Sequence, residues 1–190
     1  MPSSPTLRIH LLGPLEVFVG DRRVSVDTRK ALAIVALVAA EARPFARDEL
    51  AAMFWPDADD EAARGALRRT LSALRSAVGP RGIAIDRARV TVDPATTWVD
   101  LLELERLAAS DRDADLEAAA ALARGPFLAG FALRDSPDFD DWQAARAVRV
   151  ERLVGDVLDR LVAARSHGGD PSGAIDIARR RVALDPLDEP

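Results

Sequence analysis

The stretch ARGALRRTLSALRSAVG, residues 63–79, contains four arginines, no acidic residue and a leucine every three or four positions. At helical spacing its apolar residues fall on one face, which predicts an amphipathic helix with a single buried stripe. Asp59, Asp60 and Glu61 suit a first helical turn, and Gly79-Pro80 a helix end, so the predicted helix covers about residues 60–78. The predicted stripe consists of Leu67, Leu71, Leu74 and Val78.

The rest of this helix divides into two flanks. One is acid-free after Glu61 and mixes arginine with small residues, and the other consists of small residues that we expect to pack closely against other elements. The first flank comprises Arg64, Gly65, Arg68, Arg69, Ser72, Arg75 and Ser76. The second comprises Ala66, Thr70, Ala73 and Ala77.

The segments around this helix predict its fold class. Residues 7–12 and 15–19 read as strands of an N-terminal antiparallel sheet, and helices are expected from Asp27 or Thr28 to about Ala42 and over 46–54. Residues 82–93 form two alternating runs around the turn at 86–89, which predicts a β-hairpin. An antiparallel sheet, three helices and a C-terminal hairpin indicate an α+β winged helix-turn-helix with an extra N-terminal sheet, assigned to residues 1–98.

Residues 99–190 are rich in Ala, Leu and Arg and predict an all-α domain. Helices are expected over 99–110, 114–125, 139–165 and 171–186. The last two, joined by HGGD at 167–170, have the form of a tetratricopeptide repeat, with Ala174, Ala178 and Ala183 at close-packing positions and Pro186 at the end. Because one repeat cannot bury its own apolar face, we expect the chain to be part of a longer protein.

Composition narrows the functional classes. The 190 residues are 48% hydrophobic and 30% charged, as in soluble globular proteins, and none is cysteine. We expect a cytoplasmic protein, since residues 1–8 do not resemble a signal peptide and no apolar run could span a bilayer. His10 and His167 lie far apart, and there is no phosphate loop of the GxxxxGK[ST] type. We therefore expect no enzyme activity, no metal site and no cofactor.

Charge is unevenly distributed along the chain. The net charge is −5, yet residues 62–89 contain seven arginines and one acid, Asp86. On an ordinary solvated face, these arginines would pair with acids from elsewhere in the protein. An acid-free helix followed by a basic hairpin instead favours DNA binding. The helix would enter the major groove, and the hairpin would contact the backbone or the minor groove. The predicted contacts are Arg64, Arg68, Arg69, Ser72 and Arg75 on the helix, Arg87 and Arg89 on the wing, and Thr28, Arg29 and Lys30 as phosphate contacts at a helix N-terminus.

Several stretches, in this order, carry a family resemblance: LRIHLLGPLEV, RKALAIVALVA, RDELAAMFWPDADDEAARGALRRTLSALRSAVG, RGPFLAGF, DFDDWQAARAVRVERL and ALDPLDEP. The chain resembles bacterial transcriptional activators of the antibiotic regulatory protein type, which join an OmpR-type winged helix to a bacterial transcriptional activator domain (BTAD). The resemblance implies sequence-specific binding to double-stranded promoter DNA by residues 1–98. It also implies contacts between the helical domain and RNA polymerase or other proteins, or homodimerisation. A receiver domain is absent, so phosphorylation control of the OmpR kind is not expected.

An alternative function remains open. In this alternative, the winged helix does not read DNA. Together with the helical part, it serves as an interaction or scaffold module of a larger signalling protein. The overall acidity of the chain favours this alternative, and the arginines of residues 62–89 oppose it.

Overall fold

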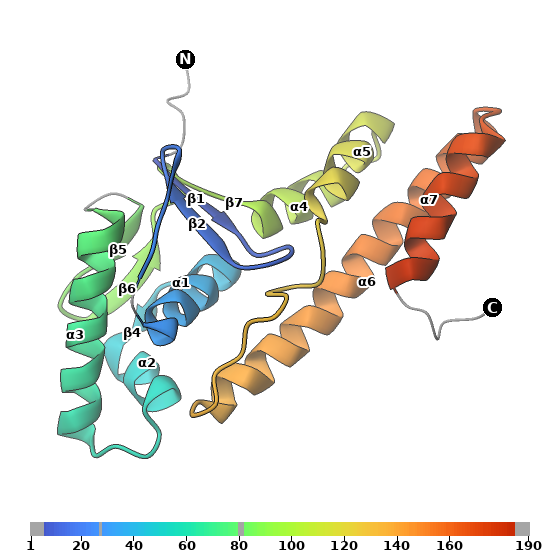
Figure 1. Cartoon of the computed structure of the whole chain (residues 1–190). Helices are drawn as coiled ribbons and strands as arrows, with labels where there is room; N and C mark the ends of the chain where they lie inside the picture. Colours follow the sequence, from blue (N-terminus) through green and yellow to red (C-terminus); the bar gives the residue numbers. More distant parts are fainter. Residues whose placement is uncertain (1–5, 27, 80–81, 185–190) are drawn as a thin grey trace.

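A computed structural model describes residues 6–26, 28–79 and 82–184 of the chain (Figure 1). The expected α+β class is confirmed, with two small sheets in the N-terminal half and helices along the whole chain. The strands are β1 (Leu7–His10), β2 (Glu16–Val19), β3 (Arg22–Arg23), β4 (Phe45–Ala46), β5 (Ile83–Ile85), β6 (Arg89–Val92) and β7 (Thr97–Val99). The helices are α1 (Arg29–Glu41), α2 (Arg47–Phe54), α3 (Asp60–Val78), α4 (Asp100–Ala108), α5 (Asp113–Leu122), α6 (Pro137–His167) and α7 (Pro171–Leu184).

The N-terminal sheet differs from the expectation in two strands. Strands β1 and β2 pair antiparallel as predicted, and β3, which the sequence did not predict as a strand, pairs antiparallel with β2. Strand β7 adds to the other side of β1 in parallel, so the sheet is mixed, with the order β3-β2-β1-β7. The chain returns from the hairpin to this sheet just before α4, and the backbone N–H of Leu7 donates to Thr96 O at 3.1 Å. A three-residue strand carries too little periodicity to be recognised in the sequence.

Helix α1 lies at the centre of the N-terminal half. The sequence predicted one apolar face, but every residue from Ala31 to Ala40 except Leu32 is buried. A helix that is apolar on all sides must be covered on all sides, which explains the run ALAIVALVAA. Thr28 is its N-cap residue, although its hydroxyl makes no capping hydrogen bond, and Asp27 lies outside the described residues.

Helix α3 forms as predicted. Asp59 is its N-cap, accepting a hydrogen bond from the Ala62 backbone N–H at 2.8 Å. Gly79 ends the helix with a φ of 80°, a backbone conformation that glycine adopts without strain, and Pro80 lies outside the described residues. The hairpin β5–β6 follows, and β4, a strand that the sequence did not predict, extends it to the order β4-β6-β5.

The C-terminal half consists of helices, and α6 is the longest of them. In Figure 1, α6 runs from the end of α2 to α7, which folds back against it after the turn at Gly168–Gly169. Ala174 is buried in this helix pair and Ala178 is half-buried, whereas the side chain of Ala183 and all of Pro186 lie outside the described residues. The tetratricopeptide likeness of this pair stays a prediction.

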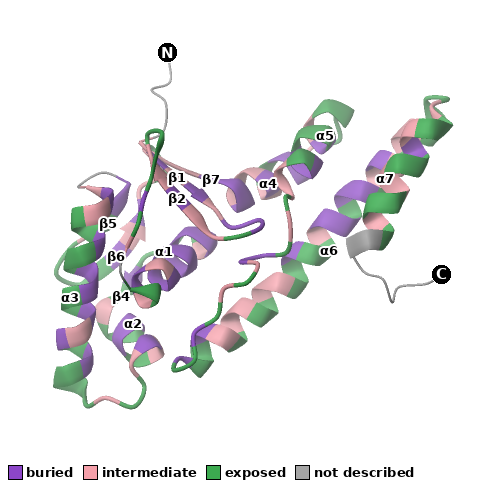
Figure 2. Cartoon of the chain, viewed as in Figure 1, coloured by how far each residue is buried: buried purple, intermediate pink, exposed green. Residues whose placement is uncertain are grey.

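The hydrophobic core continues across the predicted boundary at residues 98 and 99 (Figure 2). The rings of Phe54 in α2 and Phe139 in α6 lie 5.4 Å apart, and Trp142 Nε1 of α6 donates to Glu41 Oε1 of α1 at 2.9 Å. Arg146 of α6 donates to Ala40 O at the end of α1 at 3.0 Å. The start of α6 is thus packed on the helices of the N-terminal half, while the division into two domains stays a prediction.

Candidate nucleic-acid interface

The apolar stripe of α3 is buried as predicted. Leu67, Leu71, Leu74 and Val78 are each at most 3% exposed, and they fix the rotation of the helix about its axis. The opposite arc faces solvent, with Arg64, Arg68, Arg69, Ser72, Arg75 and Ser76 all exposed. Gly65 lies in this arc but is itself buried, and a Cβ there would meet Arg69 Nη1 at 3.6 Å and Arg68 Nη2 at 3.9 Å.

A groove of about 330 Å³ separates α3 from the wing, the β5–β6 hairpin. Arg68, Ser72 and Arg75 border it from α3, and Arg87 from the turn of the wing. The structure thus brings four of the residues proposed from the sequence to one place. Arg89 is exposed on β6 but is not one of the residues that line this groove. The complete lining is Arg47, Arg68, Leu71, Ser72, Arg75, Ile85, Asp86 and Arg87.

Asp86, the acid in this basic region, serves the wing itself. Its Oδ1 accepts hydrogen bonds from the backbone N–H groups of Ala88 and Arg89, each at 2.7 Å. These two hydrogen bonds lower the pKa of the Asp86 carboxyl group. The carboxylate therefore holds the turn that carries Arg87, and its acceptor oxygen is turned toward the wing backbone.

Arg47 is a basic residue of the groove that the sequence did not indicate. It is the first residue of α2, directly after β4, and its backbone N–H donates to Ala88 O at 2.9 Å. Its guanidinium donates to Asp86 O at 3.2 Å, which places its charge between α2 and the wing. No local pattern marks Arg47, because its position depends on the pairing of β4 with β6, some 40 residues later.

One arginine of α3 pairs with an acid from another helix, which was the alternative to DNA binding for all the arginines of this face. Arg64 Nε donates to Asp48 Oδ1 of α2 at 2.8 Å, and this hydrogen bond raises the pKa of the Arg64 side chain. The acid-free run therefore does not exclude pairing, because the partner comes from another helix. Within the described residues, Arg68, Arg69 and Arg75 make no ion pair.

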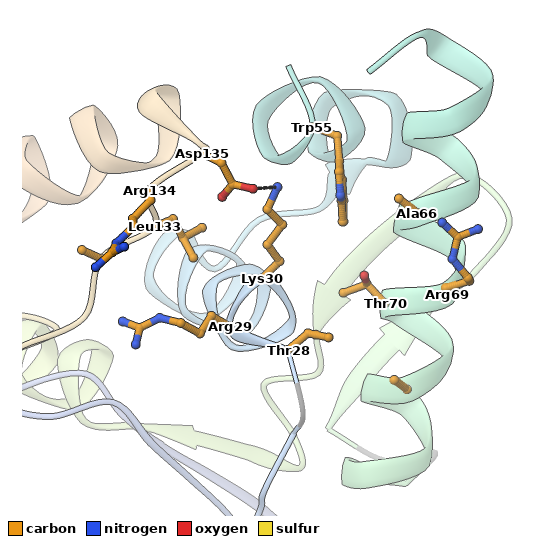
Figure 3. A pocket seen from close by; sticks show the side chains of 12 residues that line it. Thr28, Arg29, Lys30, Trp55, Ala66, Arg69, Thr70, Leu133, Arg134 and Asp135 are labelled. Carbon is orange, nitrogen blue, oxygen red and sulfur yellow. Dashed lines mark ion pairs between the residues drawn. The ribbon is translucent and has the colours of Figure 1, made fainter. Parts of the chain in front are cut away.

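Thr28, Arg29 and Lys30 do not border the groove. They line a second and larger depression of about 1000 Å³ between α1 and α3, which we call the α1–α3 cleft (Figure 3). Lys30 differs from the expected phosphate contact, since its side chain is 16% exposed and its ammonium pairs with Asp135 at 2.8 Å. The same ammonium donates to Phe54 O and lies 5.0 Å from the ring centre of Trp55. Its charge is therefore satisfied inside the protein.

The small flank of α3 also departs from expectation. Thr70 is buried, but Ala66 and Ala77 are half-buried and Ala73 is exposed. Ala77 packs against the core, whereas Ala66, Thr70 and Ala73 form one wall of the α1–α3 cleft. The opposite side consists of the start of α1 and residues 132–135, the loop before α6 (Figure 3).

Half-buried His10 and buried Asp100 form a polar cluster that links the end of β1 to α4. Asp100, 1% exposed, accepts hydrogen bonds from the backbone N–H groups of Leu11 and Leu12 at 2.7 and 3.1 Å, which ties the end of β1 to α4. His10 Nδ1 lies 3.6 Å from this carboxylate. Burial lowers the pKa of His10 and raises that of Asp100. Within residues 6–26, 28–79 and 82–184, no group of three or more acidic or histidine side chains could hold a metal ion.

No helix in the described part of the chain has the length and apolar character needed to cross a membrane.

Comparisons with known proteins bear on the fold. No model of a protein family matches the chain, and no curated protein matches it. Among solved structures, Mycobacterium tuberculosis EmbR in complex with a low-affinity phosphopeptide is similar, with a TM-score of 0.56 and 22% sequence identity over 95% of this chain. This chain spans 60% of the length of that EmbR chain. At this identity, the likeness establishes that the two proteins share a fold across nearly all of the present chain.

Proposed function

We propose that this chain is a sequence-specific DNA-binding transcription regulator that acts as an activator. In this proposal α3 enters the major groove of promoter DNA, and the wing follows the backbone or the minor groove. The observation that carries the proposal is the groove between α3 and the wing, where Arg68, Arg75 and Arg87 stand exposed without an ion-pair partner in the described residues.

The geometry suits a duplex for two reasons. A 19-residue helix with a continuous exposed face can lie in a major groove, which is wide enough to admit an α-helix. Arginine can donate two hydrogen bonds to guanine O6 and N7 and also pairs strongly with phosphate. Ser72 and Gly65 keep the face low between the arginines, so the helix backbone can approach the base edges.

The roles of the individual residues follow from their surroundings. Arg68, Arg69, Ser72 and Arg75 are proposed to contact bases or phosphates, and Arg47, Arg87 and Arg89 to contact the backbone or the minor groove. Arg64 would have to leave Asp48, and Lys30 would have to leave Asp135, before either could bind a phosphate. We therefore rank these two residues below the others as DNA contacts.

The C-terminal helices are proposed to contact other proteins, such as RNA polymerase, or a second copy of the chain. Their attachment to α1 and α2 through Phe139, Trp142 and Arg146 would hold such a partner at a defined position relative to α3. The likeness to the EmbR chain extends over both halves of the present chain, which supports an arrangement in which the two halves belong to one shared fold.

The test starts with a duplex that the protein selects from a random pool. Fluorescence anisotropy then measures its affinity, and that of an unrelated duplex, at two salt concentrations. The variant Arg68→Ala/Arg75→Ala is compared with Arg149→Ala/Arg152→Ala, two exposed arginines of α6. Loss of a base-reading arginine costs about 1–3 kcal/mol, whereas each lost phosphate contact lowers the slope of log K against log salt by about 0.9.

The α3 variant should lose at least about tenfold in affinity for the selected duplex, and the α6 variant should bind as the wild type does. Equal binding by wild type and α3 variant, or failure of the pool to yield a preferred duplex, would reject the proposal. That result would favour the scaffold alternative.

A further inference from the structure

We propose that the α1–α3 cleft is a docking site for an acidic segment of a partner protein that also carries an apolar side chain. The proposal goes beyond the DNA contacts described above and does not depend on them. Its basis is the shape of the cleft and the charge of its lining.

The cleft offers space and an apolar surface beside α3. Its volume of about 1000 Å³ lies at the upper end of the range for binding pockets. Ala66, Thr70 and Ala73 leave the α3 side shallow, and the half-buried Trp55 supplies a larger apolar surface. These features leave room for an incoming leucine or phenylalanine side chain.

The charge of the lining is strongly positive. Four of the lining residues are basic and one, Asp135, is acidic, and Asp135 is paired with Lys30. The guanidinium groups of Arg29, Arg69 and Arg134 therefore stand without an ion pair in the part of the chain that the structure describes. Arg29 rests 5.0 Å from the ring centre of Phe131, and such a contact leaves its donors available.

These cations lie on opposite sides of the cleft. Figure 3 shows Arg69 on α3 at one side, and Arg29 and Arg134 at the other, with their side chains extending from α1 and the 132–135 loop along the outer edge, away from α3. A peptide that crosses the cleft could place acidic residues against both sides and an apolar residue between them. Complementary charge of this kind increases the association rate and selects among partners.

The recessed shape favours a peptide over a duplex. Single side chains can enter a cavity of this size, while the broad convex surface of DNA meets the exposed arc of α3 and the wing instead. Arg69 belongs to both surfaces, so a protein bound in the cleft would lie beside DNA bound to α3. The cleft would thus receive a protein assembled on the same promoter.

The test measures anisotropy of a short fluorescein-labelled peptide in which Asp and Glu flank central Leu and Phe residues. The full chain is compared with Arg134→Glu and with Ala132→Glu, both in the exposed loop that lines the cleft, and with Arg152→Glu on the exposed face of α6. Arg134→Glu and Arg152→Glu carry the same change in net charge, and circular dichroism checks that every variant is folded.

We expect the wild type and Arg152→Glu to bind the acidic peptide, and the two loop variants to bind about fivefold to tenfold more weakly. Arg134→Glu reverses a charge at the cleft and Ala132→Glu adds a carboxylate there, so each variant repels the acidic peptide. A peptide with Lys in place of Asp and Glu should not bind. Affinity for the selected duplex should be the same in Arg134→Glu as in Arg152→Glu.

Three results would overturn the proposal: no binding of the acidic peptide by the wild type, equal peptide binding by the loop variants and the wild type, or equal weakening in Arg152→Glu. A loss of duplex affinity confined to the loop variants, with peptide binding unchanged, would assign the cleft to DNA instead. Absence of duplex binding together with peptide binding would reject the proposed DNA function and leave the cleft proposal standing.

Discussion

Gly65→Ala separates the stability of α3 from its function. Gly65 lies inside a 19-residue helix, where glycine costs about 0.5–1 kcal/mol relative to alanine. An added Cβ would meet Arg69 Nη1 at 3.6 Å and Arg68 Nη2 at 3.9 Å, ordinary contact distances to the mobile ends of long side chains. Alanine should therefore fit, raise the free energy of unfolding by about 0.5–1 kcal/mol and raise Tm by about 1–4 °C.

The same methyl group would stand on the face proposed to enter the major groove. It would hold the helix farther from the base edges and restrict Arg68 and Arg69, so we expect at least about a tenfold loss of affinity for the selected duplex, on the scale of one arginine–base contact. Thermal unfolding and anisotropy measure the two effects. Ser166→Ala near the end of α6 is the control, since it favours helix without touching α3.

The two outcomes test different steps. A lower Tm for Gly65→Ala would refute the packing argument, because it would mean that the site cannot accept a Cβ. Unchanged duplex affinity in a stabilised variant would refute close approach of this face to DNA.

Three further predictions concern the wing, the contact between the two halves of the chain, and the half-buried His10. Asp86→Ala removes the acceptor for two backbone N–H groups of the wing, so duplex affinity should fall while the change in Tm stays small. A loss of Tm as large as that of a core variant would contradict a role confined to the wing. Arg146→Leu breaks hydrogen bonds to Ala40 O and to Glu105, and should lower the free energy of unfolding in urea by about 2 kcal/mol. The free energy of unfolding should also rise as the pH increases to about 6.5, the usual pKa of histidine. Burial lowers the pKa of His10, so the unfolded chain takes up a proton at a higher pH than the folded protein does.

The controls for these variants are close in chemistry. Asp86→Asn keeps an acceptor oxygen and should retain most of the duplex affinity. Arg149→Leu, exposed on the same helix as Arg146, should leave stability nearly unchanged. The pH dependence near 6.5 should disappear in His10→Gln and persist in His167→Gln, and a dependence that survives in His10→Gln would assign the titration to another group.

Local pattern accounts for the elements that the sequence predicted well. The stripe of α3, the acidic first turn of α3 at Asp60 and Glu61, and the hairpin around Asp86 depend on residues close together in the sequence, so each is visible in a short window. The failures are short strands. β4 and β7 have two and three residues, and they form only because a strand distant in the sequence offers them backbone partners.

The candidate interface likewise has features that local sequence predicts and features that depend on contacts between distant segments. The sequence alone determined that α3 has one buried stripe and one acid-free basic face, because helical periodicity assigns each side chain to a face before any other element is present. Only the tertiary structure decided what each charge meets. It brought Arg47 to the wing, paired Arg64 with Asp48 and Lys30 with Asp135, and left the small flank of α3 open as a cleft. Such pairings depend on which distant segments pack together, and that depends on burial of the whole core.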